Sequence, residues 1–239
     1  MILLQELFQD LQYGELSQFA VTGDIDEPMT GITAQDYPAI VSHLNKALTA
    51  IHTRLPLRDR ELTLQLFEEL SFYKLSSEYA VSNTGSSEPI KYIIDTPDRP
   101  FIDDVLGITA VYDELGCPIP LNDENNCDSY WLNNYCTLQV VNPADENTVF
   151  LTYRANHPKI ETNADPATTE IDIPDYCIEP VLFYVASRMY SRSNDAGAIS
   201  RSLEMMQKYE AYCQEIERRN VLNNYNNNTN LKLEQRGFV

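Results

Sequence analysis

The 239-residue sequence has few of the residues and motifs from which active sites are built. It contains only three histidines, and it has no glycine-rich phosphate loop, no G-x-S-x-G and no H-E-x-x-H motif. Histidine is the side chain best suited to proton transfer near neutral pH, so little is available for acid–base catalysis. We therefore predict that the protein is not an enzyme.

Long apolar runs are also missing. No stretch approaches the roughly 18 to 20 apolar residues of a membrane span, and residues 1–11 carry carboxylates without the basic region of a secretory signal. We expect a protein that is made in the cytosol and has no membrane partner.

The cysteines and acidic loops do not form a recognisable metal motif. The five cysteines are an odd set without a C-x-x-C pair, so we expect free thiols, no metal and no cofactor. Residues 122–128 are rich in oxygen ligands and leave a calcium loop as an alternative, although they lack the glycine and terminal glutamate of an EF-hand. The five are Cys117, Cys127, Cys136, Cys177 and Cys213.

Basic residues are scarce, and the net charge of −19 is unevenly placed. Residues 1–84 hold 5 basic and 12 acidic side chains, residues 85–177 hold 4 and 17, and residues 181–239 hold 8 and 6. Such a chain does not wrap nucleic acid by neutralising phosphates, because that requires a basic surface.

Apolar spacing predicts two helices in the first part of the chain. Residues 3–19 read as an amphipathic helix, and a second helix begins after Asp36, with Pro38 in its first turn, and ends at Pro56. Residues 61–66 then alternate polar and apolar side chains, which is typical of a half-buried strand.

From about residue 82 to 175 the pattern is that of short strands. β-Favouring runs at 92–94, 107–112, 137–141 and 148–153 are separated by Pro, Gly, Asn and Asp. Residues 110–119 resemble a hairpin, and the prolines at 118 and 120 predict that its second strand lies at a sheet edge.

Helices return at the end of the chain. Runs at 173–192 and 198–219 predict an antiparallel helix hairpin. Its predicted core residues are Val181, Val185, Met189, Leu203, Met206 and Tyr209. We thus predict an α+β fold with a helical bundle from 1–81 and 176–219, including a strand near 61–67, and a β-rich insertion at 82–175.

Residues 220–239 are predicted to form an extended C-terminal arm. An asparagine-rich stretch, with too little apolar content to pack on itself, leads to a tip of alternating apolar and basic residues. Such a tip can dock on a neighbouring subunit as a strand or hook; a frayed terminus is the alternative. The predicted contact residues are Leu231, Lys232, Leu233, Arg236, Phe238 and Val239.

Two stretches resemble the head-to-tail adaptors of short-tailed phages, the tail tubular protein A family. One is the Leu44-Asn45-Lys46 helix running into the strand at 60–64; the other is Ile173-Pro174-Asp175-Tyr176 leading to Val185-Ala186-Ser187-Arg188, followed by the Tyr209–Cys213 step. Together with the order of the elements, they span most of the chain.

This resemblance implies a structural virion protein of the neck, present in the host cytoplasm during assembly. It implies a ring of about twelve copies between the portal protein and a downstream tail or nozzle protein, with DNA passing through its channel. An acidic channel wall would repel phosphates and let DNA slide without specific binding.

Other functions compete with this interpretation. A tail completion or stopper protein would share the interactions but not the twelve-fold ring, and a host regulatory or anti-defence protein would bind a bacterial partner. An acidic hydrolase would use paired carboxylates such as Asp103–Asp104, Asp113–Glu114 or Asp123–Glu124.

Overall fold

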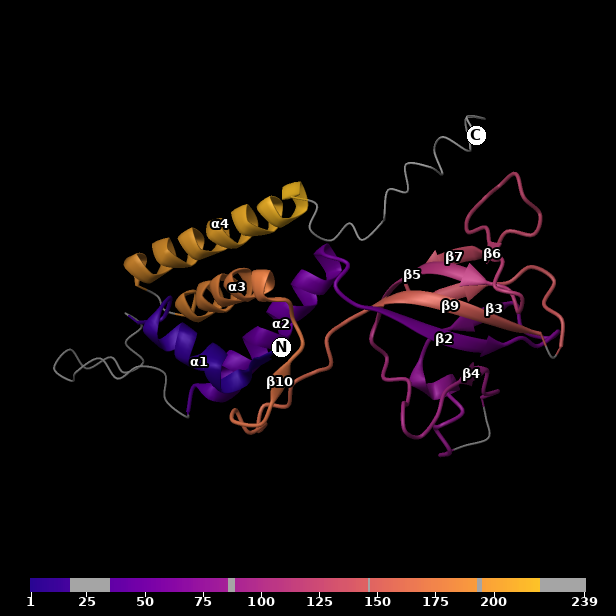
Figure 1. Cartoon of the computed structure of the whole chain (residues 1–239), viewed down its shortest axis with the longest axis horizontal. Coiled ribbons are helices and arrows are strands. Elements are labelled where there is room, and N and C mark those ends of the chain that lie inside the picture. Colours follow the sequence, from indigo (N-terminus) through magenta and orange to yellow (C-terminus); the bar gives the residue numbers. More distant parts are fainter. Residues whose placement is uncertain (18–34, 86–88, 146, 193–194, 220–239) are drawn as a thin grey trace, which may run out of the picture. The chain divides into compact units, whose positions relative to one another are not determined.

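The computed structural model describes residues 1–17, 35–85, 89–145, 147–192 and 195–219. These residues form a mixture of helices and strands, which confirms the predicted α+β class (Figure 1). The chain divides into two compact units. We call Met1–Ala47 together with the chain from Ile160 onward the helical unit, and Leu48–Lys159 the β unit.

The helical unit takes its elements from both ends of the chain. α1 and the first part of α2 come before the β unit in sequence, and α3 and α4 come after it. A two-residue strand near the N-terminus, β1, pairs antiparallel with β10. The bounds are β1 (Ile2–Leu3), α1 (Leu4–Tyr13), α2 (Tyr37–Arg54), β10 (Glu170–Ile171), a 3₁₀ turn (Asp175–Cys177), α3 (Ile178–Tyr190) and α4 (Ala196–Arg219).

α1 is shorter than the predicted helix at 3–19. It buries an apolar stripe, and it ends where the Gly14 N–H donates to the Asp10 carbonyl oxygen at 2.8 Å. A Cβ at position 14 would lie 2.8 Å from that same oxygen, so only glycine fits this close approach. Gly14 leaves the helical conformation, with φ −100° and ψ −107°, so the helix ends at Tyr13.

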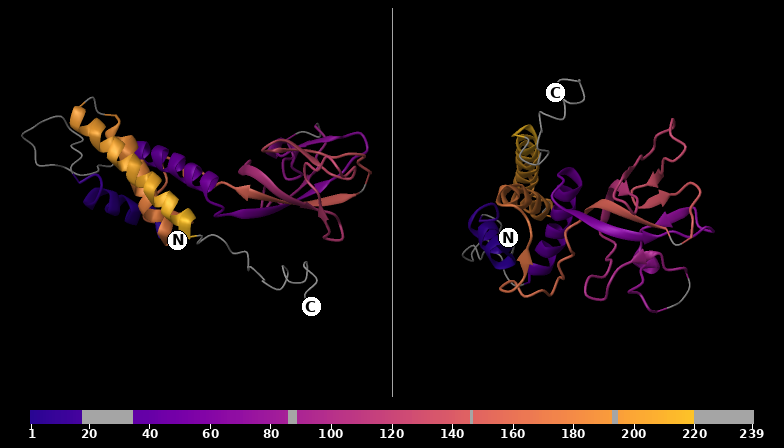
Figure 2. Two further views of the ribbon diagram at one scale, coloured as in Figure 1. Left: turned by 90° about the horizontal axis from the view of Figure 1, so that it is seen from above. Right: turned by 45° about the vertical axis from the view of Figure 1, so that its right-hand side comes forward.

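α3 and α4 pack along each other as the predicted antiparallel hairpin (Figure 2). Ser187 lies against Ser202, Tyr184 against Tyr209 and Phe183 against Tyr212. Residue numbers therefore decrease along α3 as they increase along α4, so the two helices are antiparallel. Asp195 begins α4 by accepting the Ala198 N–H, as an N-cap residue does.

The β unit holds two antiparallel sheets. Its five-stranded sheet has the order β4-β2-β9-β5-β6, and its three-stranded sheet has the order β3-β8-β7. The bounds are β2 (Asp59–Gln65), β3 (Phe72–Lys74), a 3₁₀ turn (Ser77–Tyr79), β4 (Ile93–Ile94), β5 (Val105–Tyr112), β6 (Pro118–Ile119), β7 (Trp131–Asn134), β8 (Thr137–Gln139) and β9 (Thr148–Ala155).

The predicted hairpin at 110–119 is present. β5 and β6 pair antiparallel, Gly116 takes a φ of 79° in the turn, and β6 lies at the edge of its sheet as its prolines indicate. The core of this unit is formed by alternate residues of the long strands, among them Leu64, Leu151 and Tyr153.

The predicted boundary between the two parts is wrong at both ends. The strand near 61–67 exists as β2, but β2 pairs with β9 along its whole length and so belongs to the β unit. Residues 160–175, assigned to the β insertion, belong to the helical unit, where β10 pairs with β1. Both errors come from long-range strand pairing, which leaves no mark in local periodicity.

Candidate functional site

One edge of the five-stranded sheet is open along half of β2. The Ala155 N–H donates to the Arg58 carbonyl, and the Gln65 N–H donates to the Tyr92 carbonyl. Since backbone groups alternate direction along a strand, even-numbered residues of β2 bond toward β9 and odd-numbered residues point the other way. The N–H and C=O groups of Asp59 and Glu61 therefore point to the β4 side.

β4 covers only part of that side. It pairs with Thr63 and Leu64 alone, and no other strand of the described residues pairs with Asp59 or Glu61 there. β4 stops because residues 95–101 turn away: they contain Pro97 and Pro100, and the Arg99 N–H donates to the Thr96 carbonyl at 3.0 Å.

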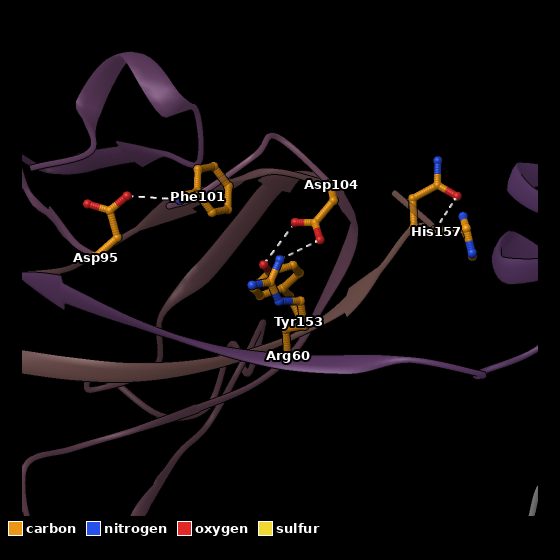
Figure 3. A network of polar contacts seen from close by, with 7 residues as sticks. Arg60, Asp95, Phe101, Asp104, Tyr153 and His157 are labelled. Carbon is orange, nitrogen blue, oxygen red and sulfur yellow. Dashed lines mark hydrogen bonds and ion pairs between the residues drawn. The ribbon is translucent and has the colours of Figure 1, made fainter. Parts of the chain in front are cut away.

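Asp95 fixes this turn. Its carboxylate accepts the Ser82 N–H at 2.8 Å and the Ser82 hydroxyl at 2.5 Å. It also accepts the Phe101 N–H at 2.8 Å (Figure 3). Burial by itself would raise the pKa of Asp95, but these hydrogen bonds outweigh it and hold the pKa below its usual value.

An open groove of about 620 Å³ lies between the free part of β2 and the turn. Its volume falls within the range of ordinary ligand pockets. Phe150, which is 43% exposed, adds an apolar surface. The lining residues are Asp59, Arg60, Glu61, Leu62, Thr63, Ile94, Asp95, Thr96, Arg99, Pro100, Phe101, Phe150 and Tyr153.

A polar network holds the floor of the groove. The Asp104 carboxylate, only 4% exposed, accepts a 2.9 Å bond from the Arg60 guanidinium and another from the Tyr153 hydroxyl (Figure 3). Burial lowers the pKa of Arg60, but the hydrogen bond that Arg60 donates to Asp104 leaves this pKa raised overall. Burial, and next the charge of Asp104, raise the pKa of Tyr153. Arg60 and Tyr153 are thereby fixed in orientation.

The carboxylate pairs considered for a hydrolase accept hydrogen bonds that hold the fold together. Asp103, at a φ of 57°, accepts from the backbone and hydroxyl of Ser77, whereas Asp104 faces Arg60 and Tyr153. Asp113 accepts the N–H groups of Leu115 and Cys117 in the hairpin turn.

Asp123 of the third pair and Glu114 of the second pair also accept hydrogen bonds from the backbone. Asp123 accepts the Asn125 N–H, and Glu114 accepts the Thr148 N–H at 2.7 Å. Asp113 and Asp123 thus accept from their own loops, Asp103 and Glu114 accept from the backbone of other segments, and Asp104 accepts from side chains.

Two histidines meet inside the β unit. The rings of His52 and His157 lie edge-on with centroids 5.9 Å apart, and both residues are buried. His157 Nδ1 lies 2.6 Å from the Pro158 carbonyl, and the Asn156 side chain accepts the His157 N–H (Figure 3). His52 is buried in the core, whereas His43 is half-buried.

In the helix hairpin, the predicted core is right except at one position. Val181, Val185, Met189 and Tyr209 are buried, and Met206 is half-buried. Leu203 is 62% exposed, so its assignment to the core is wrong. Ser202 faces α3 instead, since its hydroxyl donates to the Ser187 carbonyl at 2.9 Å, and Leu203 lies one position further round the helix.

The predicted arm residues, Leu231, Lys232, Leu233, Arg236, Phe238 and Val239, lie outside the described residues. The groove along β2 was not predicted. Its strand was recognised from alternation, but Arg60, Asp104 and Tyr153 are far apart in sequence, so no local signal brings them together.

Within the described ranges, no group of three or more His, Cys, Asp or Glu side chains is arranged to hold a metal ion. Over the same ranges, no helix is long and apolar enough to cross a membrane. Compared with known proteins, the chain matches no protein-family model, and no curated protein matches its sequence significantly.

Proposed function

We propose that the chain is a structural virion protein: a head-to-tail adaptor that forms a ring, of about twelve copies, between the portal and the tail of a short-tailed phage. It works by docking surfaces together and not by catalysis. Its partners are the portal protein, further copies of itself and a downstream tail or nozzle protein. Its location is the virion neck, after assembly in the host cytoplasm.

The observation that carries this proposal is the discontinuous helical unit. Segments from before and after the β unit fold together, in the order of elements that the resemblance to the adaptor family implies. A β unit inserted between helices leaves both the first and the last helices of the chain in one body, as an adaptor with a helical ring and a separate contact domain requires.

Exposed apolar side chains on α4 support a role in association. Ile199 and Leu203 are 48% and 62% exposed and lie four residues apart, on one face of the helix. Met206, half-buried, continues that face. Leucine, isoleucine and methionine grouped in this way are typical of surfaces that other subunits cover.

The charge of the chain supports a channel through which DNA slides. The helical unit, residues 1–47 and 160–239, carries 19 acidic and 9 basic side chains, and the whole chain carries −19. A wall of this sign repels phosphates, the reverse of the basic surface that binds DNA through counterion release.

The test is assembly with the portal protein of the same genome. Purified chain mixed with portal rings should form a stacked ring complex, seen by size-exclusion chromatography and electron microscopy, with about one copy per portal subunit. A chain ending at Arg219 should stay folded by circular dichroism but should no longer associate.

A chain whose residues 231–239 are scrambled is the matched control, because it keeps the length and composition of the arm. It should fail like the truncated chain. The absence of any complex at several salt concentrations, or undiminished assembly without the arm, would contradict the proposal.

A further inference from the structure

The open part of β2 is a place where an extended segment can pair with the sheet. We propose that residues 231–239 of a neighbouring copy add there as an extra strand, in the groove between Asp59–Leu62 and the turn at 95–101. The proposal rests on the assembly role proposed for the arm, and it names the surface that the arm meets.

The backbone supplies the first argument. Asp59 and Glu61 direct two N–H and two C=O groups into the groove, next to the Thr63–Ile94 pair, where β4 already occupies this side. An incoming strand therefore continues the line of β4 along β2. Main-chain bonds give the affinity in such strand addition, and pockets for alternate side chains give the specificity.

Side chains on the two faces of β2 supply the second argument. Leu62 lies on the core face, where buried Phe101 and Tyr153 also line the groove. Asp59 and Glu61 lie on the solvent face and are exposed. The free edge thus has apolar Leu62 and Phe101 beside the paired Arg60 on its core face, and acidic side chains on the other face.

The arm has the matching alternation. Leu231 and Leu233 fall on one face of an extended strand and Lys232 falls on the other. With the leucines toward Leu62 and Phe101, Lys232 meets the carboxylates of Asp59 and Glu61. Glu234, on the same face as Lys232, has the charge to meet Arg99, which also lines the groove.

Charged residues also protect sheet edges from unwanted pairing, and Asp59 and Glu61 could serve that purpose alone. The groove favours strand pairing over protection alone. An edge that is only protected requires neither an exposed Phe150 nor apolar side chains beside the free backbone groups.

The test uses a fluorescent peptide of residues 228–239 added to the full-length chain, with binding followed by anisotropy. Saturable binding is expected. Glu61→Pro should weaken it at least about ten-fold, because proline removes an N–H that faces the groove and spares the hydrogen bonds to β9. Glu61→Ala, the matched control, removes only the charge and should change affinity less than about three-fold.

Modified peptides test the same contact with the unaltered protein, so the result does not depend on folding of Glu61→Pro. N-methylation at Leu231 or at Lys232 should differ sharply in effect, because only alternate N–H groups of an added strand face β2. Equal binding of both methylated peptides, binding of a scrambled peptide, or full binding by a folded Glu61→Pro chain would overturn the proposal.

The two proposals can fail separately. Peptide binding of the expected kind, in a chain that ignores portal rings, would sink the adaptor function and keep the strand contact. Ring assembly by a chain that does not bind the peptide would sink only the strand contact.

Discussion

The β unit and the helical unit leave different chemistry on their surfaces. In the β unit a buried polar network, Arg60 with Asp104 and Tyr153, supports a strand edge whose backbone groups are unpaired. In the helical unit the strands are the two-residue β1 and β10, and exposed apolar side chains, among them Ile199 and Leu203, lie on helices. One unit can recognise an extended segment through its main chain, and the other a packed surface through apolar contact.

Cysteine reactivity gives the largest expected contrast between the units. Cys117 and Cys127 of the β unit are exposed, whereas Cys177 and Cys213 of the helical unit are fully buried. Burial raises the pKa of Cys177 to about 12, so its thiolate is scarce as well as hidden.

A thiol reagent should therefore label the exposed pair first. The buried pair should react at least about a thousand-fold more slowly, since labelling must wait for the helical unit to open. Mass spectrometry of digests at successive times measures both rates. Comparable rates at Cys177 and Cys117 would show that α3 and α4 do not shield their core.

The hairpin offers the next largest effect. Met189→Ala leaves a cavity at a fully buried site and should lower the free energy of unfolding by about 3 kcal/mol. Leu203→Ala, on the exposed face of α4, should change it by less than about 0.5 kcal/mol. Urea unfolding followed by far-UV circular dichroism compares them. A large loss at Leu203 would place that side chain in the core after all.

Local patterns in the sequence predicted this hairpin well and the β unit less completely. The helical period indicates which face of α4 is buried. It cannot decide between two neighbouring residues at the border of that face, and so it predicts Leu203 in the core where the structure has Ser202. The short strands were found at 107–112 and 148–153 because alternation and turn residues are local. Their pairing with β2, and the groove that follows from it, depends on residues that lie far apart in the chain.

The polar network of the β unit gives a smaller but sharper prediction. Asp104→Ala removes both acceptors and leaves the Tyr153 hydroxyl, itself buried, without its partner. A loss of about 2 kcal/mol is expected, less than for a fully buried ion pair because the Arg60 side chain is 28% exposed and can be hydrated.

Trp131, the only tryptophan, lies in β7 and reports unfolding of this unit by fluorescence. Asp98→Ala, an exposed carboxylate in the adjacent turn, is the matched control and should stay within about 0.5 kcal/mol of the unaltered chain. Equal stability of the two variants would show that the network does not hold the unit together. Any loss of peptide binding or ring assembly in Asp104→Ala must be compared with this loss of stability.

The smallest expected effect is the pH dependence that Asp95 gives to the stability of the β unit. The pKa of Asp95 is lowered in the folded chain, so ionised Asp95 stabilises the β unit above its unfolded pKa, and this contribution is lost as pH falls through the lower folded value. Asp95→Asn should reduce stability by under about 1 kcal/mol near neutral pH, since the residue is partly hydrated, and should flatten the decline in acid. Tryptophan fluorescence at a series of acidic pH values measures this, with Asp98→Asn as the control. An unchanged acid profile in Asp95→Asn would mean that the turn beside the groove does not depend on a charged Asp95.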